Sequence, residues 1–311
     1  MSMTLLFYSD TDAPGPWRDA FALELPEMEF RVWPDVGEPE RVSYALVWRP
    51  PHGLLASLSN LKAILSLGAG VDHILSDSRL PEGVPVVRMV DAGLAAQMSE
   101  YALYGVLHFH RHMQQYGEQQ RRAQWRQVPA VSAPERTVGI MGLGVLGGDF
   151  ASKLLPLGFE VLGWSRTPKS LPGVTTFQGR EGLSAFLGRT EILANFLPLT
   201  PETTGILCAG TFSHLPRGAC IINIARGAHL DEPELLAALN EGQLGGAMLD
   251  VFHSEPLPVE HPLWHHPRVV ITPHVAAQAI AELMVAQVID NIRRVERGER
   301  PLGLVDRRRG Y

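Results

Sequence analysis

The sequence predicts an α/β protein of two domains, each built on a parallel β-sheet. The first observation is its length of 311 residues, which exceeds what one hydrophobic core usually covers. The second is a composition of 45% hydrophobic and 19% charged residues, which excludes disordered and fibrous chains. The third is an alternation of short apolar segments with helical patterns along almost the whole chain, which is typical of parallel βαβ units.

Two series of strands are expected. The first series lies in the N-terminal third, at residues 4–8, 44–47, 63–67 and 86–88. A long helical pattern then runs from residue 95 to about 126, and a polar connector follows at 129–134. The second series lies at residues 138–141, 160–164, 192–195, 219–224, 246–251 and 269–272. No internal repeat or low-complexity segment interrupts either series.

Capping residues mark two of the later helices. A helix is predicted at 232–240, where Asp231 is a suitable N-cap and Pro233 fits the first turn. The last helix is predicted from residue 279 to about 297, and Gly298 ends it after a basic final turn.

Charge and apolar patterning limit the partners and the compartment. The net charge of −6 predicts no overall basic field for nucleic acid or anionic lipid. The N-terminus lacks a signal-peptide pattern, and no apolar stretch is long enough for a membrane span. Cys208 and Cys220 cannot form a disulfide framework and are interpreted as small core residues. We therefore expect a soluble, cytoplasmic protein with no nucleic-acid or membrane partner.

A glycine-rich turn, GLGVLG at 142–147, follows the strand of the second series that ends at residue 141. In this strand-to-helix context Gly142 permits the tight turn, Gly144 lets the backbone approach a pyrophosphate, and Gly147 lets helix and strand pack closely. The amides and dipole at the start of the helix would bind the phosphates. The motif therefore predicts a Rossmann-type dinucleotide site.

The end of the following strand indicates which dinucleotide binds. An acidic residue there would hold the ribose hydroxyls of NAD and repel a 2′-phosphate. The nearest acid, Glu160, lies at the wrong end of that strand. The carboxyl end instead carries two hydroxyls, a guanidinium and an ammonium, which suit a phosphate dianion. We predict a preference for NADP(H), with NAD(H) left open, through Ser165, Arg166, Thr167 and Lys169.

Three further residues lie where strands of the second series end. Arg226 follows the strand at 219–224, Glu255 follows the strand at 246–251, and His274 follows the strand at 269–272. A nicotinamide supplies hydride, so the protein must supply a proton and orient an electrophile. A cation for a carboxylate, an imidazole and a carboxylate to hold that imidazole are what reduction of a 2-oxoacid needs.

These motifs resemble the D-isomer-specific 2-hydroxyacid dehydrogenase family over essentially the whole chain. The shared motifs occur in family order: GLGVLG, LPLTPET from Leu197, NIARG, LDVFHSEP and TPH. Flanking segments such as YALVW at 44–48 and LGAGVD at 67–72 are most similar to the glyoxylate/hydroxypyruvate reductase A type. One departure is the sequence Asp91-Ala92-Gly93, where the family more usually has Asn-x-Thr.

The resemblance implies a domain arrangement. A Rossmann-type dinucleotide-binding domain at 99–275 would be inserted into a smaller flavodoxin-like α/β domain made of 1–98 and 276–311, which would bind the substrate. The active-site cleft would lie between the two domains. The helices at 97–126 would carry a homodimer interface.

The resemblance also implies roles for individual residues. Arg226 would bind the carboxylate and carbonyl of a 2-oxoacid, His274 would donate the proton, and Glu255 would fix the imidazole and favour its protonated form. The implied substrate contacts are Trp48, the backbone amides of Ala69, Gly70 and Val71, Arg226 and Trp264. The implied cofactor contacts, besides the residues of the 2′-phosphate site, are Gly142, Gly144, Val145, Leu146, Gly147, Leu197, Pro198, Ile224, Ala225, Asp250 and His274.

The implied reaction is NADPH-dependent reduction of glyoxylate to glycolate and of hydroxypyruvate to D-glycerate. The alternatives are a reductase of a different or larger 2-oxoacid and a dinucleotide-sensing corepressor. A formate dehydrogenase would have glutamine in place of Glu255, and no tyrosine has the lysine four residues on that a short-chain dehydrogenase needs. No metal is expected, because His108, His110 and His112 have no acidic or cysteine partner nearby in the sequence.

Overall fold

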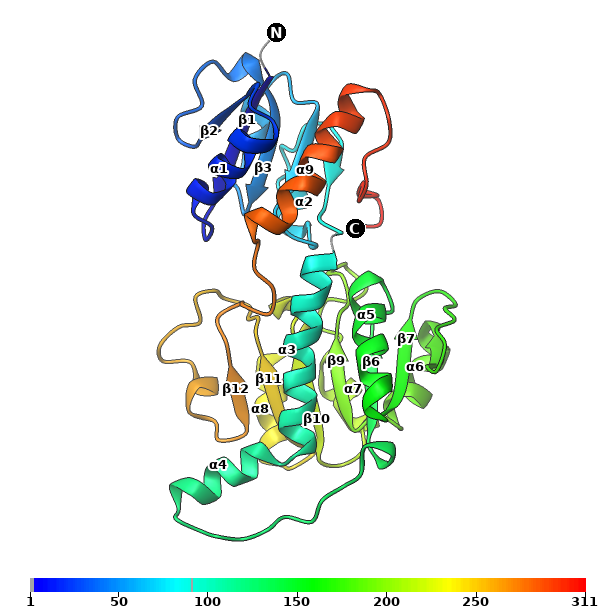
Figure 1. The fold of residues 1–311 in the computed structure, drawn as a ribbon. Helices are drawn as coiled ribbons and strands as arrows, with labels where there is room; N and C mark the ends of the chain where they lie inside the picture. The colour runs from blue at the N-terminus through cyan, green and yellow to red at the C-terminus, as the bar shows by residue number, and fades with distance from the viewer. Residues whose placement is uncertain (1–2, 91) are drawn as a thin grey trace. The chain divides into compact units, whose positions relative to one another are not determined.

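A computed structural model describes residues 3–90 and 92–311 of the chain (Figure 1). The chain divides into two compact units, unit 1 (Met1–Leu94 and Gln278–Tyr311) and unit 2 (Ala95–Ala277). Unit 2 is therefore one continuous segment inserted into unit 1. Within the described ranges, no helix combines the length and apolar character that crossing a bilayer requires.

Unit 1 is built on a five-stranded sheet in which all neighbouring strands are parallel. Its order, β2-β1-β3-β4-β5, is the flavodoxin-like doubly wound order, which confirms the predicted fold class. The edge strand β2 was not predicted, because only its first residue is buried and its apolar pattern is weak. The strands are β1 (Met3–Ser9), β2 (Met28–Val32), β3 (Val42–Trp48), β4 (Ala63–Ser66) and β5 (Val86–Val87).

The N- and C-terminal segments of unit 1 share one core. Helix α1 (Pro14–Glu24) packs against the last helix, α9 (Ala281–Glu296), and a short helix α2 (Asp72–Leu75) follows β4. Near the end of α9, Glu296 accepts hydrogen bonds from Tyr44 at 2.6 Å and Lys62 at 2.7 Å. Single 3-10 turns occur at η1 (Pro39–Arg41) and η2 (Leu55–Ser57).

Unit 2 is built on a seven-stranded parallel sheet of order β12-β11-β10-β9-β6-β7-β8. The order reverses between β6 and β9, as in Rossmann-type sheets, which also confirms the prediction. The edge strand β8 was not predicted, since none of its residues is fully buried. The strands are β6 (Thr137–Met141), β7 (Glu160–Ser165), β8 (Thr175–Gln178), β9 (Ile192–Asn195), β10 (Ala219–Asn223), β11 (Leu244–Leu249) and β12 (Val269–Ile271).

Helices cover both faces of this sheet (Figure 1). Helices α3 (Ala92–His110) and α5 (Val145–Leu154) lie on one face. Helices α6 (Gly179–Leu187), α7 (Ala209–His214) and α8 (Glu232–Asn240) lie on the other. The side chain of Asp231 caps α8 by accepting from the Glu234 amide at 2.9 Å, as predicted. The 3-10 turns are η3 (Ala133–Glu135), η4 (Leu155–Leu157), η5 (Gly227–His229) and η6 (Pro262–His265).

The helical pattern predicted from 95 to about 126 corresponds to two helices, and the second ends before residue 126. The chain forms α3 and a separate helix, α4 (Met113–Arg121), with a break at His112, whose φ of 56° is left-handed. No residue of α4 is buried, so no packing extends the helix beyond Arg121. In Figure 1 α4 and the stretch after it lie outside the α/β body of unit 2.

Candidate active site

The carboxyl edge of the unit 2 sheet collects most of the predicted unit 2 site residues. All seven strands are parallel, so the segments that follow them emerge at one edge. In strand order this edge carries His274 after β12, Asp250 and Glu255 after β11, Arg226 after β10, Leu197 after β9, the glycine motif after β6 and Ser165 at the end of β7. Trp264 lies in η6, before β12, and its indole is 45% exposed.

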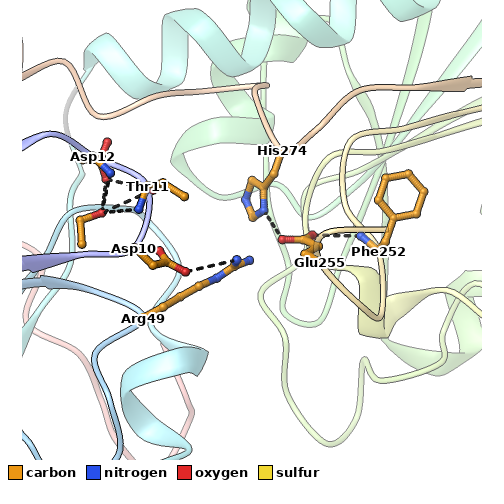
Figure 2. Close-up of polar contacts among 8 residues, drawn as sticks. Asp10, Thr11, Asp12, Arg49, Phe252, Glu255 and His274 are labelled. Atoms are coloured by element: carbon orange, nitrogen blue, oxygen red, sulfur yellow. Dashed lines mark hydrogen bonds and ion pairs between the residues drawn. The ribbon is translucent and has the colours of Figure 1, made fainter. Parts of the chain in front are cut away.

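A hydrogen bond joins the predicted acid and its partner. His274 Nδ1 lies 2.8 Å from Glu255 Oε2 (Figure 2). The other carboxylate oxygen, Oε1, accepts from the Phe252 amide at 3.0 Å. Both side chains are partly buried, with exposed fractions of 26% for His274 and 16% for Glu255. Because Nδ1 is committed to the carboxylate, Nε2 is the nitrogen that can serve a substrate.

Asp250 holds the segment that carries His274. Its side chain is fully buried, and Oδ1 accepts from the Thr272 hydroxyl at 2.6 Å and the Val275 amide at 2.8 Å, while Oδ2 accepts from the Ala276 amide at 2.8 Å. Burial raises the pKa of Asp250, and these bonds oppose that rise. These partners make Asp250 a positioning residue for the His274 segment, and its contact with the cofactor stays a prediction.

The backbone of His274 adopts a conformation that needs such support. Its φ of 57° is left-handed, which is costly for a residue other than glycine. The His274 amide also donates to the Asp250 carbonyl at 2.8 Å. Strained backbone of this kind persists where surrounding bonds determine it and is concentrated at functional sites.

A hydroxyl pair continues this network to helix α3. Tyr101 Oη lies 2.5 Å from Thr272 Oγ1. Thr272 uses its single proton on Asp250, so Tyr101 is the donor to Thr272. Burial is the main cause that raises the pKa of Tyr101 to about 12, which keeps it a neutral donor. Sequence reasoning missed Tyr101, because nothing in a helical pattern indicates which tyrosine reaches a distant threonine.

Two buried asparagines fix the loop that carries Arg226. Asn195 and Asn223 are the last residues of β9 and β10, both fully buried, and Asn195 donates to Asn223 at 3.1 Å. Asn223 donates in turn to the Arg226 carbonyl at 3.1 Å, and Asn195 accepts from the Leu197 amide. The Arg226 side chain is half-buried. Sequence reasoning missed both asparagines, although a polar residue closing an apolar strand was the available signal.

The glycine motif has the geometry that a dinucleotide requires. Gly142 has a φ of 100°, and a Cβ on Gly147 would lie 2.0 Å from the Gly142 carbonyl oxygen. A Cβ on Gly144 would meet nothing within 4 Å, so open space lies above the N-cap of α5. No side chain caps that helix. These residues therefore fit a pyrophosphate group.

The end of β7 presents cationic and hydroxyl groups to solvent. Ser165 is buried and donates to the Thr167 carbonyl at 2.7 Å, whereas Arg166, Thr167 and Lys169 are exposed. Glu160, at the opposite end of the strand, is paired with Arg189. No acidic residue thus stands at the position where NAD-specific sheets carry one.

A second guanidinium lies near this end of the sheet. This guanidinium belongs to Arg180, and it acts on Glu202 together with Arg166. The pKa of Glu202 is lowered first by hydrogen bonds from the Glu202 amide and from Thr200, and then by the positive charges of Arg166 and Arg180. Arg180 is the second residue of helix α6 and is exposed. The Trp164 indole donates to the Gly179 carbonyl at 2.8 Å, which ties α6 to the end of β7. Sequence reasoning missed Arg180, since it follows a strand that was not predicted.

The remaining residues predicted to bind the cofactor line the same edge. Leu197, Ile224 and Ala225 are buried, Val145 is exposed, and Leu146 and Pro198 are intermediate. The Pro198 carbonyl accepts from Thr203 at 2.7 Å. Among the helix histidines, His108 packs against Tyr104 and Phe109, and His110 packs against Phe159 with ring centroids 5.0 Å apart.

The predicted substrate residues of unit 1 lie at the carboxyl edge of its own sheet. Trp48 is the last residue of β3, and Ala69, Gly70 and Val71 form the loop after β4. The Ser66 hydroxyl organises this loop by accepting from the Gly68 amide at 3.2 Å and donating to the Gly70 carbonyl at 3.3 Å. Asp91, where the sequence departs from the family pattern, lies outside the described residues, as does the side chain of Ala92.

The chain is similar to known proteins in both sequence and structure. The family profile "D-isomer specific 2-hydroxyacid dehydrogenase, NAD binding domain" matches residues 103–276. A curated relative from Yersinia enterocolitica, named glyoxylate/hydroxypyruvate reductase A, is 48% identical over 99% of this chain and all of its own. The chain belongs to the D-isomer-specific 2-hydroxyacid dehydrogenase family. A second relative of the same name, from Serratia proteamaculans, is 46% identical over the same shares.

Solved structures of D-isomer-specific 2-hydroxyacid dehydrogenases agree with this membership. A protein of the family from Xanthobacter autotrophicus Py2, in complex with NADPH and MES, matches with a TM-score of 0.96 and 45% identity over all of both chains. An NADPH-dependent glyoxylate/hydroxypyruvate reductase from Sinorhizobium meliloti, in complex with NADP and sulfate, matches with a TM-score of 0.93 and 39% identity over 99% of this chain and 100% of that chain. The family predicted from the sequence is thereby confirmed.

Proposed function

We propose that this chain is an NADPH-dependent reductase of small 2-oxoacids, with glyoxylate and hydroxypyruvate as substrates. The observation that carries the proposal is the Glu255–His274 pair, 2.8 Å apart, on the same sheet edge as Arg226 and a glycine motif that fits a dinucleotide. Relatives that are 46–48% identical over 99% of the chain bear the name glyoxylate/hydroxypyruvate reductase A. The reaction is 2-oxoacid + NADPH + H⁺ → 2-hydroxyacid + NADP⁺.

The cofactor would occupy the carboxyl edge of the unit 2 sheet. When bound, it supplies a hydride to C2 of the substrate. Residues 142–147 would hold its pyrophosphate, and Ser165, Arg166, Thr167 and Lys169 would bind its 2′-phosphate. Arg166 and Lys169 are exposed cations, and no acidic residue stands at the end of β7. Both observations support NADPH over NADH as the cofactor.

Residues of both units would bind the substrate. Arg226 would hold its carboxylate and carbonyl oxygens, and the amides of residues 69–71 would complete the carboxylate contacts, with Trp48 and Trp264 as apolar walls. His274 Nε2 would donate a proton to the carbonyl oxygen as the hydride reaches C2. Glu255 would keep the other ring nitrogen protonated and stabilise the imidazolium, which is regenerated from solvent after each turnover.

The test is steady-state NADPH oxidation with glyoxylate and hydroxypyruvate. Wild-type protein should turn over both acids, and His274→Ala should lower kcat/KM by about 10³-fold or more while NADPH still binds. His214→Ala, at the exposed end of α7 and away from the carboxyl edge, is the matched control and should leave turnover unchanged. NADPH binding without turnover of any 2-oxoacid would contradict the proposal and favour a dinucleotide-sensing protein.

We further propose that the chain forms a homodimer through α3, α4 and the stretch after them. Leu107, Met113 and Trp125 are exposed apolar residues there, and Trp125 is 101% exposed. Apolar groups gathered on one segment favour association. Light scattering after gel filtration should give twice the chain mass, and Trp125→Ser should shift it toward the monomer. A monomeric wild type would contradict the proposal.

We also propose that the enzyme works in the cytoplasm. Both cysteines of the chain, Cys208 and Cys220, are free, and burial raises the pKa of Cys220 to about 12, which leaves it an unreactive thiol. Fractionation of cells expressing the native gene should recover the activity with cytoplasmic markers, and recovery with periplasmic markers would contradict the assignment.

A further inference from the structure

The sheet of unit 1 has its own topological switch point. In the sheet β2-β1-β3-β4-β5 the strand order reverses between the parallel strands β1 and β3. Ligands of such sheets bind at that point, outside the carboxyl ends of the strands. Ser9 of β1 lies opposite Trp48 of β3 in register. The residues that follow these two, Asp10 and Arg49, therefore stand at the switch point. Neither is among the residues given a role above.

The two side chains face each other at this edge. Arg49 Nη1 lies 3.8 Å from Asp10 Oδ2 (Figure 2), and each side chain is about one third exposed, at 33% and 35%. The guanidinium carbon of Arg49 also lies 6.0 Å from the Trp48 ring centroid. Arg49 has a φ of 47°, a left-handed conformation that is uncommon for arginine and is found at ligand-binding positions.

Neighbouring contacts fix both partners. The Ser9 hydroxyl accepts from the amides of Thr11 and Asp12 at 3.2 and 2.8 Å and donates to the Asp12 carboxylate, so the turn carrying Asp10 is closed. Trp48 packs on His73 with ring centroids 4.3 Å apart. A Cβ on Gly68 would lie 2.5 Å from the Trp48 ring, so only glycine lets the indole lie against the residue that precedes the loop of residues 69–71. The pair therefore borders the loop proposed to bind the substrate carboxylate.

The separation of the pair suits one hydroxyl group. An oxygen atom can lie at hydrogen-bond distance from both of two atoms that are 3.8 Å apart. Such a hydroxyl would accept from the guanidinium and donate to the carboxylate, which satisfies both charges at once. A second carboxylate on the substrate would be attracted by Arg49 and repelled by Asp10, and a methyl group would satisfy neither.

We propose that Arg49 and Asp10 recognise the C3 hydroxyl of the substrate and so determine selectivity for a 3-hydroxy-2-oxoacid over its 3-deoxy analogue. The inference rests on the proposed function, since it concerns the substrate of the same reaction. A site built to hydrogen-bond a hydroxyl discriminates against the analogue that lacks it, because the analogue makes neither of these charge-assisted bonds. Hydroxypyruvate and pyruvate differ in this group alone.

The experiment compares kcat/KM for hydroxypyruvate and pyruvate within each preparation, with glyoxylate as a third substrate. Arg49→Met roughly keeps the length of the side chain and removes its hydrogen-bond donors. The kcat/KM for hydroxypyruvate divided by that for pyruvate should then fall roughly tenfold or more, mainly through a higher KM for hydroxypyruvate. Asp10→Asn should lower the same ratio. Arg49→Lys, which keeps the charge without the planar fork, should lie between wild type and Arg49→Met.

The matched control is Arg41→Met, which breaks an exposed ion pair with Glu38 elsewhere in unit 1 and should leave the ratio unchanged. Because the ratio is internal to one sample, partial misfolding of a variant does not alter it. Ratios within about twofold of wild type for both Arg49 variants and for Asp10→Asn would overturn the inference and leave the proposed function intact. A wild-type protein that reduces none of the three acids would overturn the proposed function, and this inference with it.

Discussion

The two ends of the carboxyl edge of the unit 2 sheet differ in how they hold their functional groups. At the β11–β12 end, Glu255 binds the ring of His274, and the fully buried Asp250 binds the segment around it through three side-chain contacts. At the β7 end, Arg166 and Lys169 extend into solvent, and only Ser165 is buried. The imidazole is thus fixed by partly and fully buried contacts, whereas the cations lie at the exposed surface.

This difference follows from the work that each end is proposed to do. Proton transfer requires a defined distance and angle, so a preorganised group saves the cost of ordering it in the transition state. Binding a phosphate requires opposite charge and donors, which flexible exposed side chains supply. Substitutions at the first end should therefore reduce turnover, and substitutions at the second should change which cofactor is used.

After His274→Ala, the largest effect is expected from Glu255→Gln. The amide keeps the shape of the side chain but cannot stabilise an imidazolium, so kcat should fall by about 10²-fold, with little change in the dissociation constant of NADPH. Steady-state kinetics with hydroxypyruvate and a fluorescence titration of NADPH measure the two quantities. Glu241→Gln, just after α8, is the control. A loss in kcat of less than about threefold would remove Glu255 from the mechanism.

Arg166→Asp should have the next largest effect, at the other end of the edge. Loss of charge-assisted bonds and repulsion of the 2′-phosphate should lower the ratio of kcat/KM for NADPH to that for NADH by about 10- to 100-fold. Arg217→Asp, at an exposed position on the amino side of β10, controls for the change in net charge. Unchanged NADPH selectivity would show that the β7 end does not recognise the 2′-phosphate.

A smaller effect is expected from Tyr101→Phe, which removes the donor to Thr272. The variant should lower kcat about three- to tenfold without changing KM for NADPH, because one buried neutral hydrogen bond is lost behind the His274 segment. Thr272→Val should not add its full effect to Tyr101→Phe in a double-mutant cycle, since both act through Asp250. Tyr104→Phe, one turn away and exposed, is the control. Strict additivity would contradict a connected network.

The smallest effect is expected away from both ends, at Glu296 in unit 1. Hydrogen bonds from Lys62 and then Tyr44 lower the pKa of Glu296 below its ordinary 4.5. A carboxyl with a lowered folded-state pKa stabilises the fold above its unfolded pKa and loses that stabilisation as pH falls through the folded pKa. Glu296→Gln should therefore reduce stability by about 1 kcal/mol at pH 7 in urea unfolding, and the deficit should vanish in acid. A deficit independent of pH would contradict the assignment.

The sequence alone could predict which residues gather at the sheet edge, for a physical reason. Parallel strands place the residues that follow them at one edge, so Arg226, Glu255 and His274 could be brought together without knowing any contact. The glycine motif could equally be predicted, because a side chain at Gly142 or Gly147 would be strained or would clash, and Gly144 leaves open space for a ligand.

The supporting contacts could not be predicted in this way. The partners of Asp250 and the pairing of Tyr101 with Thr272 join residues far apart in the sequence, and such pairs leave no local pattern. The edge strands β2 and β8 were missed because they bury too little apolar surface to show a period. The break at His112 was missed because the helical pattern continues through it, and only the loss of buried contacts in α4 reveals the end.

The most direct test of the account is a crossed measurement on two variants, His274→Ala and Arg166→Asp. Two properties of each variant are measured. The first is single-turnover hydride transfer to hydroxypyruvate at saturating cofactor, and the second is the dissociation constant of NADPH and of NADH. The account predicts that His274→Ala loses hydride transfer and keeps NADPH binding, while Arg166→Asp loses NADPH binding and keeps hydride transfer from NADH. Loss of both properties in either variant would contradict the separation of the two ends.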